Sequence, residues 1–218
     1  MAAAERLVRV GAISTDAWRT IWLRRLPAAS GGIWDRIAAF QAFDRAADAN
    51  DADAAAKALP KAWSAMQSVG LETAFADLYA AKLARLNLPA PADRLAWRIG
   101  LLGPDFDGLA GTEVPETADE SLLFAFAKGI PKMPEAAEGA GIALLAGFSA
   151  TGAPDRFAPL LQDNRSGEAV LAAIELFDAG ADGDVAKLTD AIALMRHVGL
   201  DHVARQAALQ ILLLAPDA

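Results

Sequence analysis

The chain has 218 residues, no cysteine and a formal net charge of −8. A chain of this length buries enough surface for one substantial core or one continuous stack of helices. The absence of cysteine excludes disulfides, a thiolate nucleophile and cysteine-ligated zinc. The acidic balance argues against a nucleic-acid partner, because phosphate binding requires a cationic surface.

Alanine dominates the hydrophobic fraction of 54%, and tyrosine occurs once. Alanine is the strongest helix former because it loses no side-chain entropy in a helix, and the residues that favour strands are sparse. The composition predicts an all-α protein. Together with the recurring helix ends described below, it predicts about ten helices, arranged as antiparallel hairpins that stack into an α-solenoid or an irregular helical bundle.

The first predicted helices carry three of the five tryptophans. Ser14 is a predicted N-cap for an amphipathic stretch, and Pro27 with the Gly31-Gly32 pair predicts where that stretch ends. The apolar spacing predicts a second helix over residues 33 to about 47.

Residues 1–36 contain six arginines and three acidic residues, so this segment is cationic within an acidic chain. Two interpretations are open. Tryptophan fills the core of a terminal helix pair while arginine stems lie around it, or both residue types form a contact surface for another protein, since both are over-represented at interface hot spots. The residues assigned to that surface are Trp18, Trp22, Arg19 and Arg25.

Glycine followed by an apolar residue recurs at the ends of predicted helices, at Gly11, Gly70, Gly129 and Gly199. A glycine in the left-handed conformation closes a helix, and the apolar residue after it folds back onto the last turn in the Schellman arrangement. Such recurrence favours an array of related helical units.

Two of these positions belong to the best internal match in the sequence, residues 65–72 with residues 194–201. A Phe-Asp pair lies upstream of each copy, at 43–44 and at 177–178. Two explanations are open: descent from a duplicated unit, or chance combined with shared capping chemistry.

These two helix-turn-helix segments resemble the helical-hairpin solenoids of the tetratricopeptide and Sel1-like class, over about half the chain. The early Trp, Leu-Gly and Tyr positions of the tetratricopeptide pattern are absent from both. The resemblance implies a protein that binds another protein.

Residues 103–120 break the helical pattern, because they combine three glycines and two prolines with many acidic residues. Too many turn formers are present for a helix, so an acidic loop is predicted, with Asp105 and Asp107 as further partner-binding residues. The predicted organisation is a helical repeat region over 1–102, this loop over 103–120 and a second repeat region over 121–218, all within one continuous structural unit.

Candidate catalytic and metal-binding patterns are incomplete. His197 and His202 lie five apart across a glycine, not four apart on one helix face. The acidic turns 48–53 and 178–184 lack the closing glutamate of a calcium loop, so they are interpreted as helix caps. Ser149 lacks the second glycine of a hydrolase elbow, and the glycines around it are interpreted as helix ends or close helix contacts. We predict no catalytic residue, no metal and no cofactor.

The first functional hypothesis is a non-catalytic scaffold for another protein, with self-association open. The runner-up is an all-α enzyme or small-ligand binder with a groove lined by Trp63, Trp97 and the central loop. The expected location is the cytoplasm, or the periplasm if the chain is a fragment that lacks its signal peptide. That fragment interpretation stays open, and no membrane span is expected because the longest apolar stretch is too short.

Overall fold

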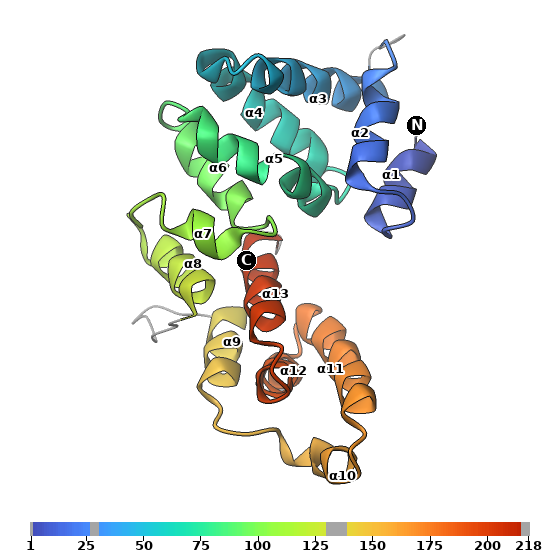
Figure 1. The fold of residues 1–218 in the computed structure, drawn as a ribbon, viewed down its shortest axis with the longest axis vertical. Helices are drawn as coiled ribbons and strands as arrows, with labels where there is room; N and C mark the ends of the chain where they lie inside the picture. The colour runs from blue at the N-terminus through green and yellow to red at the C-terminus, as the bar shows by residue number, and fades with distance from the viewer. Residues whose placement is uncertain (1, 27–30, 130–138, 215–218) are drawn as a thin grey trace. The chain divides into compact units, whose positions relative to one another are not determined.

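The computed structural model describes residues 2–26, 31–129 and 139–214, and every regular element in them is a helix (Figure 1). The all-α prediction is therefore confirmed. The described residues form thirteen α-helices where about ten were expected, and two of the additional ones are single turns of five residues. Pro27 and Ile130, which the sequence places at helix ends, lie outside the described residues. The chain divides into two compact units, residues 1–113 and residues 114–218.

Unit 1 packs its helices around a cluster of aromatic rings. Trp22 and Phe40 meet nearly perpendicular with centroids 5.3 Å apart, and Phe43 and Tyr79 do the same at 5.1 Å. Edge-to-face rings add to the stabilisation that burial alone provides. The helices of this unit are α1 (Ala2–Arg9), α2 (Thr15–Leu23), α3 (Ile33–Asp48), α4 (Ala52–Gln67), α5 (Glu72–Leu86), α6 (Ala92–Gly100) and α7 (Phe106–Ala110).

The two tryptophans of α2 belong to this core. Trp18 and Trp22 each have a relative exposure of 0%, and their ring centroids lie 4.9 Å apart. This confirms the interpretation of tryptophan as core filler. The alternative, a contact surface built on these two rings, is corrected, because neither ring presents any area to a partner.

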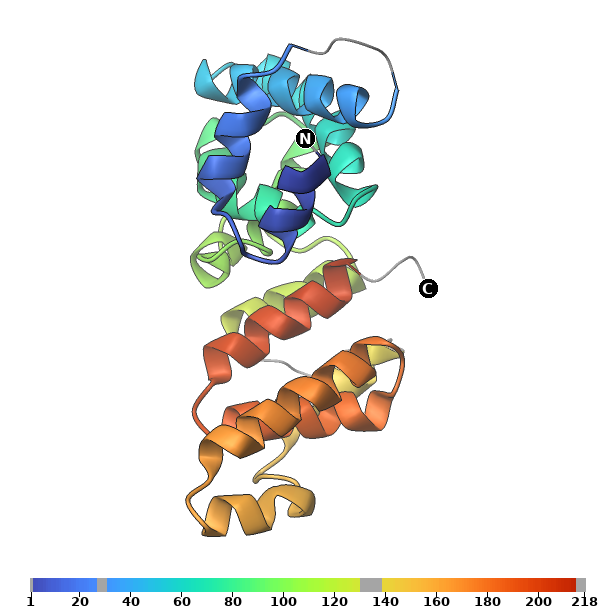
Figure 2. The same cartoon turned by 90° about the vertical axis from the view of Figure 1, so that its right-hand side faces the viewer.

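The central helix of unit 2 is α12, which packs against α9, α11 and α13. Figure 1 shows α12 between α9 and α11, and Figure 2 shows α8 beside α13. The elements are α8 (Ala118–Lys128), α9 (Ala140–Ser149), a 3₁₀ turn (Asp155–Phe157), α10 (Ala158–Gln162), α11 (Ser166–Ala181), α12 (Val185–His197) and α13 (Asp201–Leu214).

Two glycines let α12 approach its neighbours closely. A Cβ added to Gly147 of α9 would lie 2.8 Å from the Cβ of Ile192, and one added to Gly180 of α11 would lie 2.7 Å from the Cβ of Leu188. Real Cβ atoms do not come this close, so both positions require glycine. The prediction that glycines near Ser149 mark a close helix contact is confirmed at Gly147.

Left-handed residues close the helices at the predicted glycines. Gly11, Gly70, Gly129 and Gly199 have φ angles of 68°, 64°, 69° and 84°. At Gly70 the amide of Leu71 donates to the carbonyl of Met66 at 3.1 Å, the long bond of the Schellman motif. The same bond is donated by the residue after Gly11 and by the residue after Gly199. It also occurs after Asn50, Asn164 and Gly183, which the sequence did not predict.

The two segments of the internal sequence match each contain one of these glycine caps. Residues 65–72 join α4 to α5, and residues 194–201 join α12 to α13, with the glycine at the reversal in each. The upstream Phe-Asp pairs differ in environment, since Asp44 is buried and Asp178 is exposed. Duplication of an ancestral unit stays a prediction.

The predicted acidic loop contains helix. Residues 106–110 form α7, and α8 begins at residue 118, so the loop prediction is wrong for these residues. Phe106 and Ala110 lie one turn apart and both are fully buried, and that burial outweighs the turn formers around them. The division between the two units falls within this segment, after Glu113.

Replacing Gly199 with alanine tests the cap. The added methyl group meets no atom within 4 Å, so the cost is the left-handed backbone alone, about 1–2 kcal/mol of unfolding free energy. Gly167→Ala is the matched control in the same unit, because that glycine also has open space but an ordinary φ, and alanine there should stabilise by up to about 1 kcal/mol. Urea unfolding measures both, and equal effects would contradict the cap.

Candidate functional site

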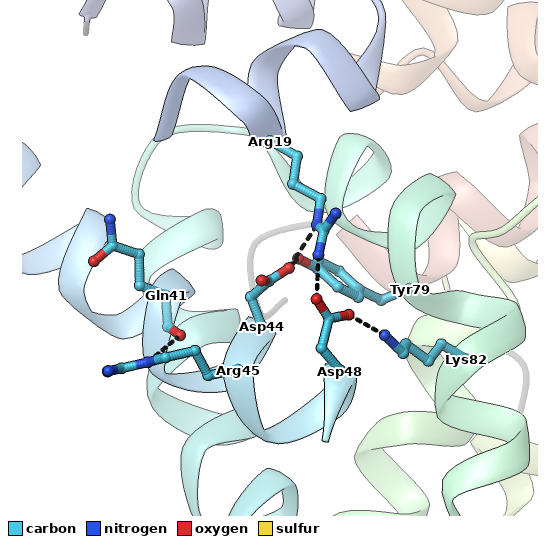
Figure 3. Close-up of polar contacts among 7 residues, drawn as sticks. All are labelled: Arg19, Gln41, Asp44, Arg45, Asp48, Tyr79 and Lys82. Atoms are coloured by element: carbon cyan, nitrogen blue, oxygen red, sulfur yellow. Dashed lines mark hydrogen bonds and ion pairs between the residues drawn. The ribbon is translucent and has the colours of Figure 1, made fainter. Parts of the chain in front are cut away.

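A polar network joins three helices of unit 1 (Figure 3). The Arg19 Nε of α2 donates to Asp44 Oδ1 at 2.6 Å, and its Nη2 donates to Asp48 Oδ2 at 2.7 Å. From α5, the Tyr79 hydroxyl donates to Asp44 Oδ1 at 2.5 Å and Lys82 pairs with Asp48. Asp44 and Asp48 lie one turn apart on α3, so one helix face holds both carboxylates.

The charges of this network stabilise one another. Burial raises the pKa of Tyr79, and its hydrogen bond to Asp44 raises that pKa further. The hydrogen bond to Asp44 also raises the pKa of Arg19, while the hydrogen bond from Lys82 lowers the pKa of Asp48. Tyr79, Arg19 and Asp48 are thus held in their ordinary protonation states at neutral pH, which is typical of a brace between helices and not of a general acid or base.

Three of the six N-terminal arginines bond within unit 1. Arg36 forms a two-pronged pair with the buried Glu5, at 3.0 and 3.2 Å, and Arg9 donates to the carbonyl of Val69 at the Gly70 turn. Arg19 serves the network described above, and its side chain is 29% exposed. Its assignment as a partner-binding residue stays a prediction.

The remaining predicted partner residues, apart from the half-buried Asp107, are exposed. Arg25 is exposed just after α2, and its carbonyl accepts from Gln41. Asp105 is exposed at the start of α7, and Asp107 accepts from the amide of Gly108 at 2.9 Å. The assignment of these three residues to partner binding stays a prediction.

A small pocket of about 110 Å³ lies beside Trp97, between the end of α5, α6 and α7. It includes residues 109–113 of the central segment, as the runner-up hypothesis anticipated. Trp63 does not line this pocket and instead packs against Phe75, with the two ring centroids 6.0 Å apart. We call this hollow the Trp97 pocket; it is lined by Ala80, Leu83, Ala84, Asn87, Leu88, Asp93, Ala96, Trp97, Gly100, Leu109, Thr112 and Glu113.

A larger groove of about 540 Å³ lies between α4 and α6, where the connection before α6 crosses Pro60. Pro60 lies exposed within α4. The signal that could have revealed the groove is the run of small and proline residues just before α6. We call it the proline groove; it is lined by Asp53, Ala56, Lys57, Pro60, Pro89, Ala90, Pro91, Ala92 and Leu95.

The histidines and acidic turns have structural roles where the structure describes them. His197 lies in the last turn of α12. Asp51 accepts from the amide of Ala54 at 3.0 Å, which confirms the cap interpretation of that turn, and Asp184 caps α12 in the same way. Within residues 2–26, 31–129 and 139–214, no group of three His, Asp or Glu side chains is placed to hold a metal ion.

Comparisons with known protein families, with characterised proteins and with solved structures find no match to this chain. No helix in the described part of the chain combines the length and the apolar character needed to cross a bilayer. The proline groove and the Trp97 pocket therefore stand as candidate sites on their own geometry.

Substituting Tyr79 with phenylalanine tests the buried brace. The variant removes a donor from a carboxylate that is only 3% exposed, so we expect a loss of about 1–2 kcal/mol in unfolding free energy. Thr15→Val is the matched control, because it removes a hydroxyl-to-carboxylate bond of 2.5 Å to Asp77 that is exposed, and should cost less than about 0.5 kcal/mol. Similar losses in chemical denaturation would show that burial of the network contributes nothing.

The Asp48 pair predicts a pH dependence. Because the pKa of folded Asp48 lies below its ordinary 3.8, the ionised carboxylate contributes stability above that pH, and the contribution is lost as pH falls through the folded value. Asp48 is half exposed, so Asp48→Asn should cost less than about 1 kcal/mol at pH 7. The difference between the two proteins should vanish at acidic pH, and a difference that stays constant down to pH 2 would contradict this assignment.

Proposed function

We propose that this chain is a non-catalytic helical protein that binds another protein, and that the proline groove receives the partner. The observation that carries the proposal is the groove itself. Its volume of about 540 Å³ lies within the range of binding clefts, and seven of its nine lining residues are apolar. Exposed apolar surface that is hollowed in this way is a common feature of recognition sites.

The walls of the groove are held in place before any partner arrives. Ala55, Leu59 and Ala62 of α4 are fully buried beneath it, and Ala92 anchors the start of α6. Proline restricts the backbone of the connecting segment on the other side. Such rigidity favours binding because little conformational entropy is lost when the partner docks.

The charges beside the groove indicate the chemistry of the partner. Lys57 lines it, Lys61 follows one turn later on the exposed face of α4, and Arg98 lies one turn beyond Leu95 on α6. None of these three cations forms an ion pair with another residue in the described part of the chain. Among the lining residues Lys57 is balanced by the carboxylate of Asp53, so the positive charge beside the groove comes from Lys61 and Arg98. An apolar segment with acidic flanks is the partner that complements these two cations.

The runner-up function, binding of a small ligand, has its own supporting observation in the Trp97 pocket. The two sites use different faces of α6, since Leu95 lines the groove while Trp97 lines the pocket. Occupation of one does not require occupation of the other.

Charge reversal at Lys57 tests the proposal. Two fluorescent peptides with the same leucine and proline core, one flanked by glutamates and one by lysines, are titrated by anisotropy. We expect the glutamate-flanked peptide to bind more tightly, and Lys57→Glu to weaken that binding about tenfold, or about 1.4 kcal/mol. Reversal at Arg85, which is exposed on α5 outside the groove, changes the net charge equally and should alter the affinity less than twofold.

Three results would contradict the proposal that the groove binds an apolar segment with acidic flanks. The first is that neither peptide binds at millimolar concentration, and the second is that the lysine-flanked peptide binds as well as the glutamate-flanked one. The third is that Arg85→Glu weakens binding as much as Lys57→Glu does. Concentration-dependent sedimentation of the free protein that is abolished by Lys57→Glu would identify a second copy of the chain as the occupant instead.

A further inference from the structure

Most residues that line the Trp97 pocket are apolar, and one of them is Gly100, which has no side chain. Leu83, Leu88 and Leu109 surround the pocket, and the indole of Trp97 is buried against it. Gly100 lies on the same helix face, where an added Cβ would come within 3.3 Å of Leu109 Cδ1. The volume of about 110 Å³ suits a small ligand.

Both charged side chains that line this pocket are negative, and its one amide side chain, that of Asn87, can donate as well as accept hydrogen bonds. Asp93 and Glu113 contribute carboxylates, and no lysine, arginine or histidine lines the pocket. The Thr112 hydroxyl already donates its proton to the carbonyl of Leu109 at 2.8 Å, which leaves its lone pairs as acceptors. The ligand must therefore supply donors and a positive charge.

Trp97 adds aromatic surface and no free donor. Its Nε1 donates to the carbonyl of Ala110 at 3.3 Å, so the one polar atom of the indole is satisfied within the protein. What remains is the π-system, and tryptophan is the aromatic side chain that attracts cations most strongly. A cation held between an indole and carboxylates in a partly enclosed pocket is stabilised by both.

We propose that the Trp97 pocket binds a short-chain primary alkylammonium ion. The ammonium group has three donors for the carboxylates of Asp93 and Glu113 and for the acceptor oxygens beside them. The alkyl chain fills the space between the leucines. A bare inorganic cation would leave those apolar walls uncovered, and a neutral alcohol would leave the two carboxylates without a counter-charge. This site does not depend on the proline groove, and its ligand differs from the partner proposed there.

The experiment titrates ¹⁵N-labelled full-length protein with butylammonium chloride at constant ionic strength, following the Trp97 indole resonance, which is assigned with Trp97→Phe. We expect a saturable shift, and at least tenfold weaker binding of butanol. Asp93→Asn and Glu113→Gln should each weaken butylammonium binding at least fivefold. Asp16→Asn is the matched control, because Asp16 is also a first-turn aspartate of a helix in unit 1 but lies exposed and away from the pocket, and it should leave the affinity unchanged.

Ala96→Leu provides a second route to the answer. Ala96 lines the pocket, so leucine there should fill it and abolish the shift while the remaining amide spectrum shows a folded protein. If that variant does not fold, the two carboxylate variants still decide the matter. The proposal is overturned if no saturable shift occurs, if butanol binds as well as butylammonium, or if Asp93→Asn and Asp16→Asn behave alike.

Discussion

Each unit of this protein depends on helices that stop where the chain has to reverse, and a residue in the left-handed conformation makes that stop. The long Schellman bond satisfies a carbonyl that the helix would otherwise leave open, and it turns the following residue back over the last turn. At Gly70 that residue is Leu71, which is fully buried, so the cap also sets where α5 begins to pack. The angle between successive helices is thereby encoded locally, by very few residues.

The sequence was sufficient to predict these stops only where glycine makes them. Gly11, Gly70 and Gly199 stand out because an apolar residue follows each one, and glycine adopts a positive φ more readily than any other residue type. Asn50 and Asn164 make the same bond but were not predicted. Asparagine also caps helix N-termini and forms turns, so its presence does not distinguish one role from another.

Contacts between distant parts of the sequence were the least predictable. The apolar stripe of α2 places Trp18 and Trp22 on one face, but periodicity does not say whether that face meets the core or a partner. The Arg19 brace joins residues from three helices, and pairing across such separations leaves no local pattern. For the Trp97 pocket, the sequence correctly indicated Trp97 and the central segment as lining residues but wrongly included Trp63. The proline groove was not predicted, because it depends on how the connection before α6 lies against α4, which only the fold determines.

The glycines of this chain fall into two classes with different evolutionary latitude. Those that supply a left-handed angle in open space, such as Gly199, occupy a role that asparagine already fills at Asn50 and Asn164. Gly147 and Gly180 instead make room for α12, and no side chain of any kind is small enough to replace them. Drift among relatives would thus exchange glycine for asparagine at the reversals, whereas glycine would persist where a neighbouring helix leaves no room for a methyl group, at these two sites and at Gly103 against Ala80.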